Sequence, residues 1–209
     1  MSTVVGVDGS PDGWVVADPD RRQLTLVDTL VGLDADLIAV DIPLAFPKDG
    51  GGRDAERAAR RILGRRAPSV FSTPPRAVYE AESYEEACAI ARQLTDKAIS
   101  RQTWGLKAKV LDAAKALAAG VPLVEAHPET AFAVIAGAPC TWAKTTWSGH
   151  RERAALLRGV GMDPDAFSGA TGRAAPHDVL DAIAMAWVAG RHRDGDAMRL
   201  GEDGDPIWV

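Results

Sequence analysis

Four aspartates stand where the sequence predicts the ends of ordered elements. Asp8 closes an apolar run near the start of the chain, and Asp41 lies near the end of a second run. Asp178 and Asp181 are three residues apart, which places them on one face of a predicted helix. Clustered carboxylates suit hard ions such as Mg²⁺ or Mn²⁺. The pattern predicts a two-ion site of the kind that hydrolyses phosphodiester bonds.

Each aspartate also has a purely structural interpretation. Asp8 and Asp41 can begin turns, where aspartate is favoured. Asp178 and Asp181 can be the N-cap and N3 residues of a helix, where acidic groups are stabilising. We favour function for Asp8 and Asp41, which close two neighbouring strands, and for Asp181, which sits among apolar residues where an unpaired carboxylate is costly. For Asp178 the two interpretations remain open.

A second group of polar residues is His127-Pro128-Glu129, at the start of a predicted short helix. In a functional interpretation, Glu129 adds a metal ligand, and His127 acts as a general base or proton shuttle. In a structural interpretation, Glu129 caps the helix and His127 is a hydrogen-bonded core residue. For Glu125 we favour the structural interpretation. The four histidines have no paired spacing, so a zinc site is not expected.

Positive charge is concentrated between about residues 46 and 76, a segment that contains eight Lys and Arg residues and three acidic ones. Guanidinium groups match the geometry of phosphate, so the segment predicts a phosphate-binding surface next to the Asp41 strand. The alternative is an ordinary solvated helix face. The predicted phosphate ligands are Arg53, Arg57, Arg60, Arg61, Arg65, Arg66, Arg76, Lys144 and Arg151, and a stacking surface could be added by Gln102, Trp104, Lys107 and Lys109.

The elements that position these residues begin with three short strands separated by turns rich in Pro, Asp and Gly, which indicates an antiparallel meander. A crossover at about 30–36 makes the next strand parallel to the first. Asp8 and Asp41 are then expected at the same end of adjacent parallel strands, where ligands bind in open α/β sheets. The predicted strands are 3–8, 14–17, 23–27, 37–43, 121–126 and 206–209.

Helical patterns fill most of the remaining chain. The predicted helices are 54–63, 84–95, 101–119, a short one opening at 127–129, 148–157 and 176–191. Ser148 is the predicted cap of its helix, with Glu152 near a capping-box position. No linker divides the 209 residues, so we predict a single domain, 1–209, with a helical and basic insertion at about 46–119.

Composition narrows the class of protein. Hydrophobic residues make up 46% and charged residues 25% of the chain, which is typical of a soluble globular protein. No apolar stretch approaches the roughly 20 residues that cross a membrane. Two cysteines without metal-ligand spacing favour a reduced, cytoplasmic location. A net charge of −5 argues against a generally basic nucleic-acid-binding surface.

The order of these elements resembles the ribonuclease-H-like fold, and the placing of the carboxylates resembles that of RuvC-type resolvases. Nearly the whole chain is also similar to the family called domain of unknown function 429, a predicted ribonuclease-H-like nuclease family. The matching stretches are Gly6-Val7-Asp8-Gly9 with Gly13-Trp14-Val15, Val40-Asp41-Ile42-Pro43, the run 53–60 with 63–66, Ser69-Val70-Phe71 with Pro74-Pro75-Arg76, Gln102-Thr103-Trp104-Gly105, the run 125–129, Lys144-Thr145 with Arg151-Glu152-Arg153, and the run 177–182.

The resemblance implies an α/β fold, with a mixed sheet of three antiparallel strands followed by parallel ones and flanked by helices. It also implies a Mg²⁺- or Mn²⁺-dependent nuclease acting on nucleic acid of unknown type. The family's first turn usually carries Cys and basic residues, where this chain has Ser10-Pro11-Asp12. If that turn contacts a substrate phosphate, the negative charge of Asp12 would repel the phosphate.

Two other functions remain open at this stage. The fold can serve as a non-catalytic module that binds nucleic acid or nucleotide, with an incomplete metal site. The third interpretation is phosphotransfer, because Asp8-Gly9-Ser10 resembles the phosphate loop of the sugar-kinase and actin superfamily. Those proteins place the nucleotide between two such folds, whereas 209 residues provide one. The oligomeric state is also open, a homodimer being one possibility.

Overall fold

The computed structural model describes residues 3–48, 50–202 and 204–209. Its centre is a five-stranded sheet in the order β3-β2-β1-β4-β5. The first three strands are antiparallel, and β4 and β5 add parallel to β1, which confirms the predicted α/β fold and is consistent with a ribonuclease-H-like sheet. The strands are β1 (Val4–Ser10), β2 (Gly13–Asp18), β3 (Gln23–Val27), β4 (Leu37–Val40) and β5 (Leu123–Glu125).

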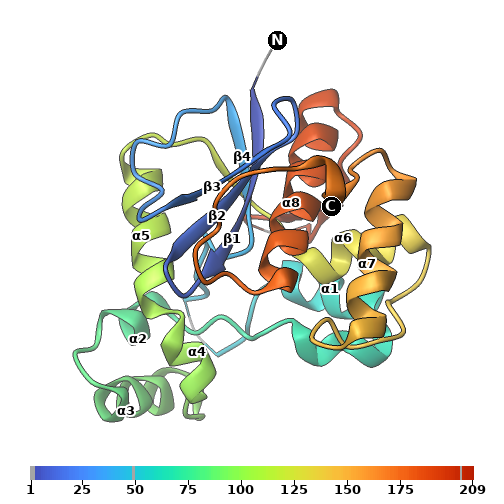
Figure 1. Ribbon diagram of the computed structural model, residues 1–209. Coiled ribbons are helices and arrows are strands. Elements are labelled where there is room, and N and C mark those ends of the chain that lie inside the picture. Colours follow the sequence, from blue (N-terminus) through green and yellow to red (C-terminus); the bar gives the residue numbers. More distant parts are fainter. Residues whose placement is uncertain (1–2, 49, 203) are drawn as a thin grey trace.

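Helices surround this sheet (Figure 1). The described part of the chain contains no helix that is long and apolar enough to cross a membrane. The α-helices are α1 (Asp54–Leu63), α2 (Arg76–Glu80), α3 (Tyr84–Thr95), α4 (Arg101–Gly105), α5 (Lys107–Ala118), α6 (Pro128–Ala136), α7 (Trp147–Gly159) and α8 (Pro176–Asp194), and the 3₁₀ helices are η1 (Gly64–Ser69) and η2 (Pro164–Ala166).

Three local predictions differ from the structure. The helix predicted over 101–119 is divided into α4 and α5 at Leu106, whose backbone N–H bonds to Thr103 as in a tighter turn. The N-cap of α7 is Thr146 and not Ser148, because the Thr146 hydroxyl accepts a hydrogen bond from the Gly149 N–H. The predicted C-terminal strand, β7 (Ile207–Trp208), pairs with an unpredicted two-residue strand, β6 (Arg199–Leu200).

The two faces of the sheet carry separate cores. On one face, Val4 and Ala39 pack in a cluster with the buried residues of α8. On the other face, Val5 and Val7 pack with residues of α5. Successive side chains of a strand point to opposite faces, so the side chains of β1 pack toward α8 and α5 in turn. Because both faces are covered, β1 appears in the sequence as a continuous apolar run. This alternation decides which side chains reach α8.

The segment between β4 and β5 has three parts. Helix α1 packs beside α6, and α5 covers the sheet. Helices α2 to α4 project as a small lobe below the sheet in Figure 1. The lobe has a buried cluster of its own, made of Val78, Ala81, Ala87 and Ala91, and Trp104 packs against it.

Gly6 lets α8 approach β1 closely. A Cβ built on Gly6 would lie 1.9 Å from the backbone nitrogen of Ala186 and 2.2 Å from the carbonyl oxygen of Ala182. Neither backbone atom can move away without displacing the helix. The absence of a side chain at Gly6 therefore sets the position of α8, including Asp181, against the strand that carries Asp8.

Replacing Gly6 with alanine is expected to destabilise the fold by at least ~1–3 kcal/mol, because the new methyl group overpacks a backbone contact. Gly9→Ala is the matched control on the same strand, since its Cβ would meet only the flexible side chain of Lys109 at 3.8 Å. Urea unfolding of both variants measures the difference. Equal stability of Gly6→Ala and Gly9→Ala would contradict the close approach of α8.

Candidate active site

The strand register places two of the predicted aspartates on the same face of the sheet. Asp8 lies two residues after Gly6, whose missing side chain faces α8, and so it points to the same side. Asp41 lies two residues after Ala39, which packs in the α8 cluster. Val7 pairs with Val40, so the two aspartates follow adjacent positions of parallel strands. This is the arrangement that the sequence pattern predicts.

Asp181 meets these two residues from α8. Its side chain is 1% exposed, and its Oδ1 is buried without a hydrogen-bond partner among the described residues. Burial raises the pKa of Asp181 to about 6, and the negative charge of Asp41 adds to this effect. Burial also raises the pKa of Asp8 well above its usual range, with further increases from Asp181 and Asp41. The three carboxyl groups therefore behave as one electrostatic unit, here called the carboxylate cluster (Asp8, Asp41 and Asp181).

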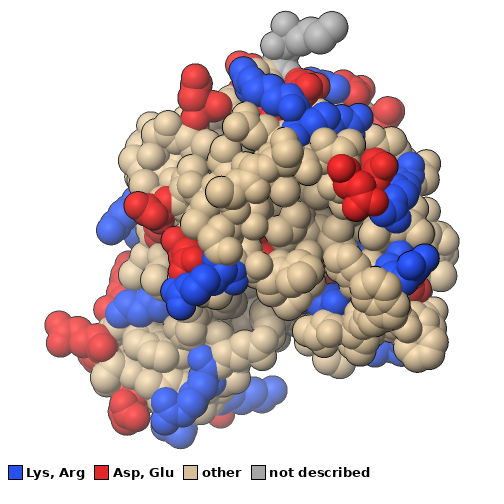
Figure 2. Space-filling view, viewed as in Figure 1, with Lys and Arg blue, Asp and Glu red and all other residues tan. Residues whose placement is uncertain are grey.

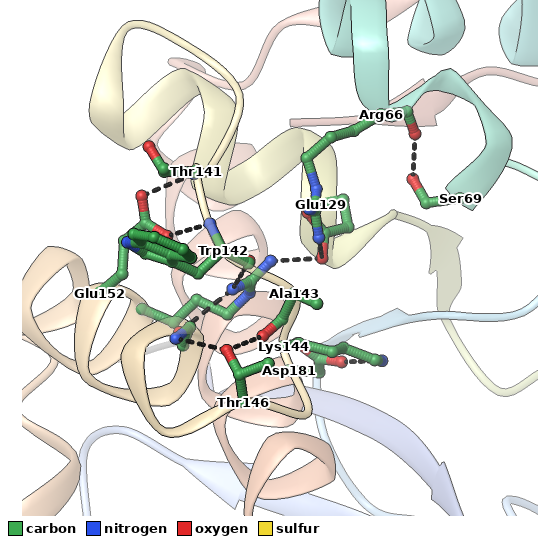
Figure 3. A network of polar contacts seen from close by, with 12 residues as sticks. Arg66, Ser69, Glu129, Thr141, Trp142, Ala143, Lys144, Thr146, Glu152 and Asp181 are labelled. Atoms are coloured by element: carbon green, nitrogen blue, oxygen red, sulfur yellow. Dashed lines mark hydrogen bonds and ion pairs between the residues drawn. The ribbon is translucent and has the colours of Figure 1, made fainter.

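Lys144 supplies the positive charge next to this cluster. Its Nζ lies 2.6 Å from Asp181 Oδ2 and donates a hydrogen bond to it. Burial lowers the pKa of Lys144, but the attraction of Asp181, Asp8 and Asp41 outweighs this and raises it. The lysine, proposed from the sequence only as a phosphate contact, is thus a charged partner of all three carboxyl groups. It comes from the loop between α6 and α7 (Figure 3).

Asp178, the fourth predicted aspartate, is at N3 of α8. Its Oδ2 accepts a hydrogen bond from the Ala175 N–H at 2.9 Å, and its Oδ1 lies 3.3 Å from His177 Nε2. Asp178 therefore stabilises the start of the helix from N3 and not as the N-cap, which is Ala175, and Asp181 lies one turn further along than the predicted N3 position. Its charge also contributes to the raised pKa of Asp8, so it lies near the cluster. Its role as a metal ligand stays a prediction.

Glu129 is held between two arginines (Figure 3). Arg153, which is completely buried, lies 2.5 Å from Glu129 Oε1, and Arg66 donates to Oε2 at 3.2 Å. Burial raises the pKa of Glu129, but the two guanidinium groups reverse this and lower it below the usual range. Glu129 is therefore a stable anion that orients Arg66 toward the space beside the carboxylate cluster.

His127 links this network to η1. Its Nδ1 accepts a hydrogen bond from the Thr130 N–H at 3.4 Å and caps α6, and its Nε2 lies 3.3 Å from the Ser69 carbonyl oxygen. With Nδ1 as acceptor, Nε2 carries the proton and donates to Ser69. Both ring nitrogens are thus engaged in structural contacts. His127 lines the same cleft as Asp41, whose pKa is raised by burial.

One cleft of about 430 Å³ joins the predicted catalytic and phosphate-binding residues. Figure 2 shows the surface hollowed between the lobe of α2–α4 and the part that carries α6 and α7. Residues from six separate segments of the sequence line it. Among them are Asp41, Arg66, Gln102, His127, Glu129, Lys144 and Asp181. The structure therefore brings six predicted site residues, and Gln102 of the predicted stacking surface, to a single cavity.

Most arginines of α1 serve other contacts. Arg53 donates two hydrogen bonds to the Glu125 carboxylate, at 2.7 and 2.8 Å, and both side chains are buried. Arg60 donates to the Val70 carbonyl oxygen at 3.0 Å. Arg57 lines a different cleft and donates to loop carbonyl groups before α1. These residues fasten the basic segment to β5 and to its own loops.

The remaining predicted phosphate ligands are exposed. Arg76 pairs with Glu80 across one turn of α2. The side chains of Arg61 and Arg65 make no hydrogen bond with any residue in the described ranges, and the Arg151 guanidinium lies 5.7 Å from the centroid of the Trp147 ring. Their binding of phosphate stays a prediction. Asp12, the acidic residue of the first turn, bonds to the backbone and side chain of Arg173 and so has its own counter-charge.

The sequence prediction missed Arg153. The signal was present, because Arg153 precedes the buried Leu157 by four residues and therefore shares the inward face of α7. An arginine on that face requires a buried anion, and Glu129 provides it. Glu152, the predicted capping-box residue, accepts hydrogen bonds from the N–H groups of Thr141 and Trp142 instead.

The donor chemistry of the carboxylate cluster fits a hard divalent ion, because it offers only oxygen and includes the unpartnered Oδ1 of Asp181. As the side chains stand, no three His, Cys, Asp or Glu residues of the described ranges are arranged closely enough to hold an ion. The Lys144 ammonium provides the counter-charge in this arrangement. Ion binding would thus require side-chain movement within the cluster.

A family model described as "Protein of unknown function (DUF429)" matches residues 6–205. The chain belongs to the DUF429 family. The match begins within β1, extends past β6 and confirms the resemblance inferred from the sequence motifs. No curated protein and no solved structure matches the chain. For this DUF429 member, function must therefore be argued from the site.

Replacing Asp8 with asparagine is expected to stabilise the protein at pH 8 by at least ~1 kcal/mol, about 2–4 °C in Tm for a chain of this length. The raised folded-state pKa of Asp8 means that wild-type stability falls as pH increases from the unfolded value of about 4 through the folded value. Asparagine cannot ionise, so the variant does not lose stability in this way as the pH increases. At pH 4 the two melting temperatures should converge.

Thermal unfolding at both pH values measures this effect, with Asp20→Asn as control because Asp20 is exposed in the turn between β2 and β3. An unchanged or lower Tm of Asp8→Asn at pH 8 would contradict the predicted electrostatic cost of the cluster.

Proposed function

We propose that the protein is a metal-dependent phosphodiesterase that acts on nucleic acid. The observation that carries this proposal is the convergence of Asp8, Asp41 and Asp181, from β1, β4 and α8, next to a cleft with cationic walls. The carboxylates of buried Asp8 and Asp181 and of half-buried Asp41 repel one another and destabilise the fold. Such an arrangement is typical of a site that gathers negative charge in order to bind cations.

Asp8, Asp41 and Asp181 would hold the Mg²⁺ or Mn²⁺ ions. Bound there, the ions would supply an activated water and neutralise charge on the phosphate in the transition state. The cluster lies on two strands and a helix that pack closely, so its members are positioned by rigid elements.

Arg66 and Lys144 are the protein groups best placed to bind the phosphate. Both line the cleft, and each is held by an ion pair, Arg66 with Glu129 and Lys144 with Asp181. Glu129 orients Arg66 through its carboxylate, and Arg153 holds Glu129 from the opposite side. His127 borders the same cleft, where its imidazole would contact the bound strand. We place the phosphate contacts on these residues and not on Arg53, whose guanidinium is committed to Glu125.

A non-catalytic binding module is the second candidate function. It is favoured by one observation, namely that Lys144 already neutralises part of the carboxylate cluster. In such a module, Lys144 and Arg66 would bind phosphate, and the aspartates would serve only to hold the lysine. Hydrolysis of nucleic acid separates the two candidates.

We expect hydrolysis of single-stranded or duplex DNA or RNA in the presence of Mn²⁺ or Mg²⁺, and a loss of at least about 100-fold in Asp8→Asn. Ions contribute several kcal/mol to the transition state, and each 1.36 kcal/mol is tenfold in rate. Asp20→Asn should retain wild-type activity. Because Asp8→Asn is expected to be at least as stable as the wild type, unfolding would not explain the loss. Equal rates for Asp8→Asn and wild type would exclude catalysis by this cluster.

A further inference from the structure

A second cleft of about 310 Å³ adjoins the candidate active site. Lys144 and Thr145 line both clefts, so the two cavities share a wall. The other lining residues of the second cleft come from the start of α7 and the start of α8. They are Thr146, Trp147, His150, Pro176 and His177. None of the lining residues is acidic, although Asp181 lies immediately beyond Lys144.

Trp147 is the dominant side chain of this second cleft. It is 72% exposed, more than any other large hydrophobic side chain of the described residues. Its ring stacks on His150, with centroids 6.2 Å apart and planes inclined by 16°. The guanidinium of Arg151 lies 5.7 Å from the same ring. His150 and Arg151 therefore fix the orientation of an indole whose remaining surface is open to solvent.

We propose that Trp147 stacks with an unpaired base of a single-stranded nucleic acid whose backbone runs past Lys144 into the active site. This inference rests on the proposed function, because it names the form of its substrate. An aromatic ring that is 72% exposed is suited to base stacking, which a base paired within a continuous duplex cannot provide. Lys144 in the cleft lining and Arg151 over the Trp147 ring supply the positive charge that a phosphate backbone requires.

The charge around Trp147 favours a nucleotide over a protein partner. Lys144 lines the cleft together with Trp147, Arg151 lies over the indole ring, and the cleft lining contains no carboxylate. A large exposed tryptophan is also common at protein interfaces. Self-association is therefore an outcome that the test must be able to detect.

The test uses the full-length protein in EDTA, so that binding is measured without hydrolysis. The probes are fluorescein-labelled twelve-nucleotide strands of thymidine or uridine, a duplex of the same length, and a thymidine strand with abasic sites at its centre. Fluorescence anisotropy at low ionic strength gives the dissociation constants. The variants are Trp147→Ala, Trp147→Phe and Trp142→Ala. Trp142 is the matched control, because it is 54% exposed but does not line the second cleft.

We expect Trp147→Ala to weaken binding of one or both intact single strands about tenfold, the loss of one stacked base. Trp147→Phe should restore most of the affinity, and Trp142→Ala should stay within about twofold of the wild type. The duplex should bind with nearly equal affinity to wild type and Trp147→Ala, as should the abasic strand, because neither offers a base to the ring. A preference for thymidine or uridine will show whether the bound strand is DNA or RNA.

Equal affinity of wild type and Trp147→Ala for both intact strands would overturn the inference, as would the absence of single-strand binding by the wild type. A change from dimer to monomer in Trp147→Ala, measured by sedimentation, would assign the ring to a protein interface instead. None of these results bears on Asp8→Asn. Metal-dependent hydrolysis that is lost in that variant would leave the proposed function intact while this inference fails.

Discussion

The interior of this protein contains three mutually repelling carboxyl groups, and much of the structure serves to hold them together. Asp8 and Asp41 reach the same face because β1 and β4 are parallel and in register, and Asp181 reaches it because Gly6 admits α8. Burial and like charge raise the pKa of all three groups. A fold selected for stability alone would not retain this arrangement, so the cost itself supports a function for the cluster.

The other buried acidic side chains differ from the cluster because each forms an ion pair with an arginine. Glu129 lies between Arg153 and Arg66, and Glu125 forms a bidentate ion pair with Arg53. For Glu129 the two guanidinium groups outweigh burial and lower the pKa, whereas for Glu125 burial outweighs the single Arg53 and raises it. The arginine-rich segment thus has two tasks. Arg53 fastens the start of α1 to β5, and Arg66, paired with Glu129 of α6, presents a cation to the cleft.

The order of strands, most helices and the meeting of Asp8 with Asp41 could be predicted from the sequence, because each follows from local periodicity and strand register. The partners of the charged side chains could not, because they depend on loops and on helix packing across the chain. Lys144 was expected to contact phosphate but forms its ion pair with Asp181, 37 residues away in sequence. Arg53 was expected at the surface, yet β5 supplies a buried acid for it.

The central claim is that the carboxylate cluster is a cation site whose present counter-charge is Lys144. Isothermal titration of Mn²⁺ into wild type, Asp8→Asn and Lys144→Gln tests it most directly. The account predicts millimolar or tighter binding to the wild type, loss of binding in Asp8→Asn, and tighter binding in Lys144→Gln, because the competing ammonium is removed. Absence of Mn²⁺ binding in both wild type and Lys144→Gln, or equal binding in wild type and Asp8→Asn, would contradict it.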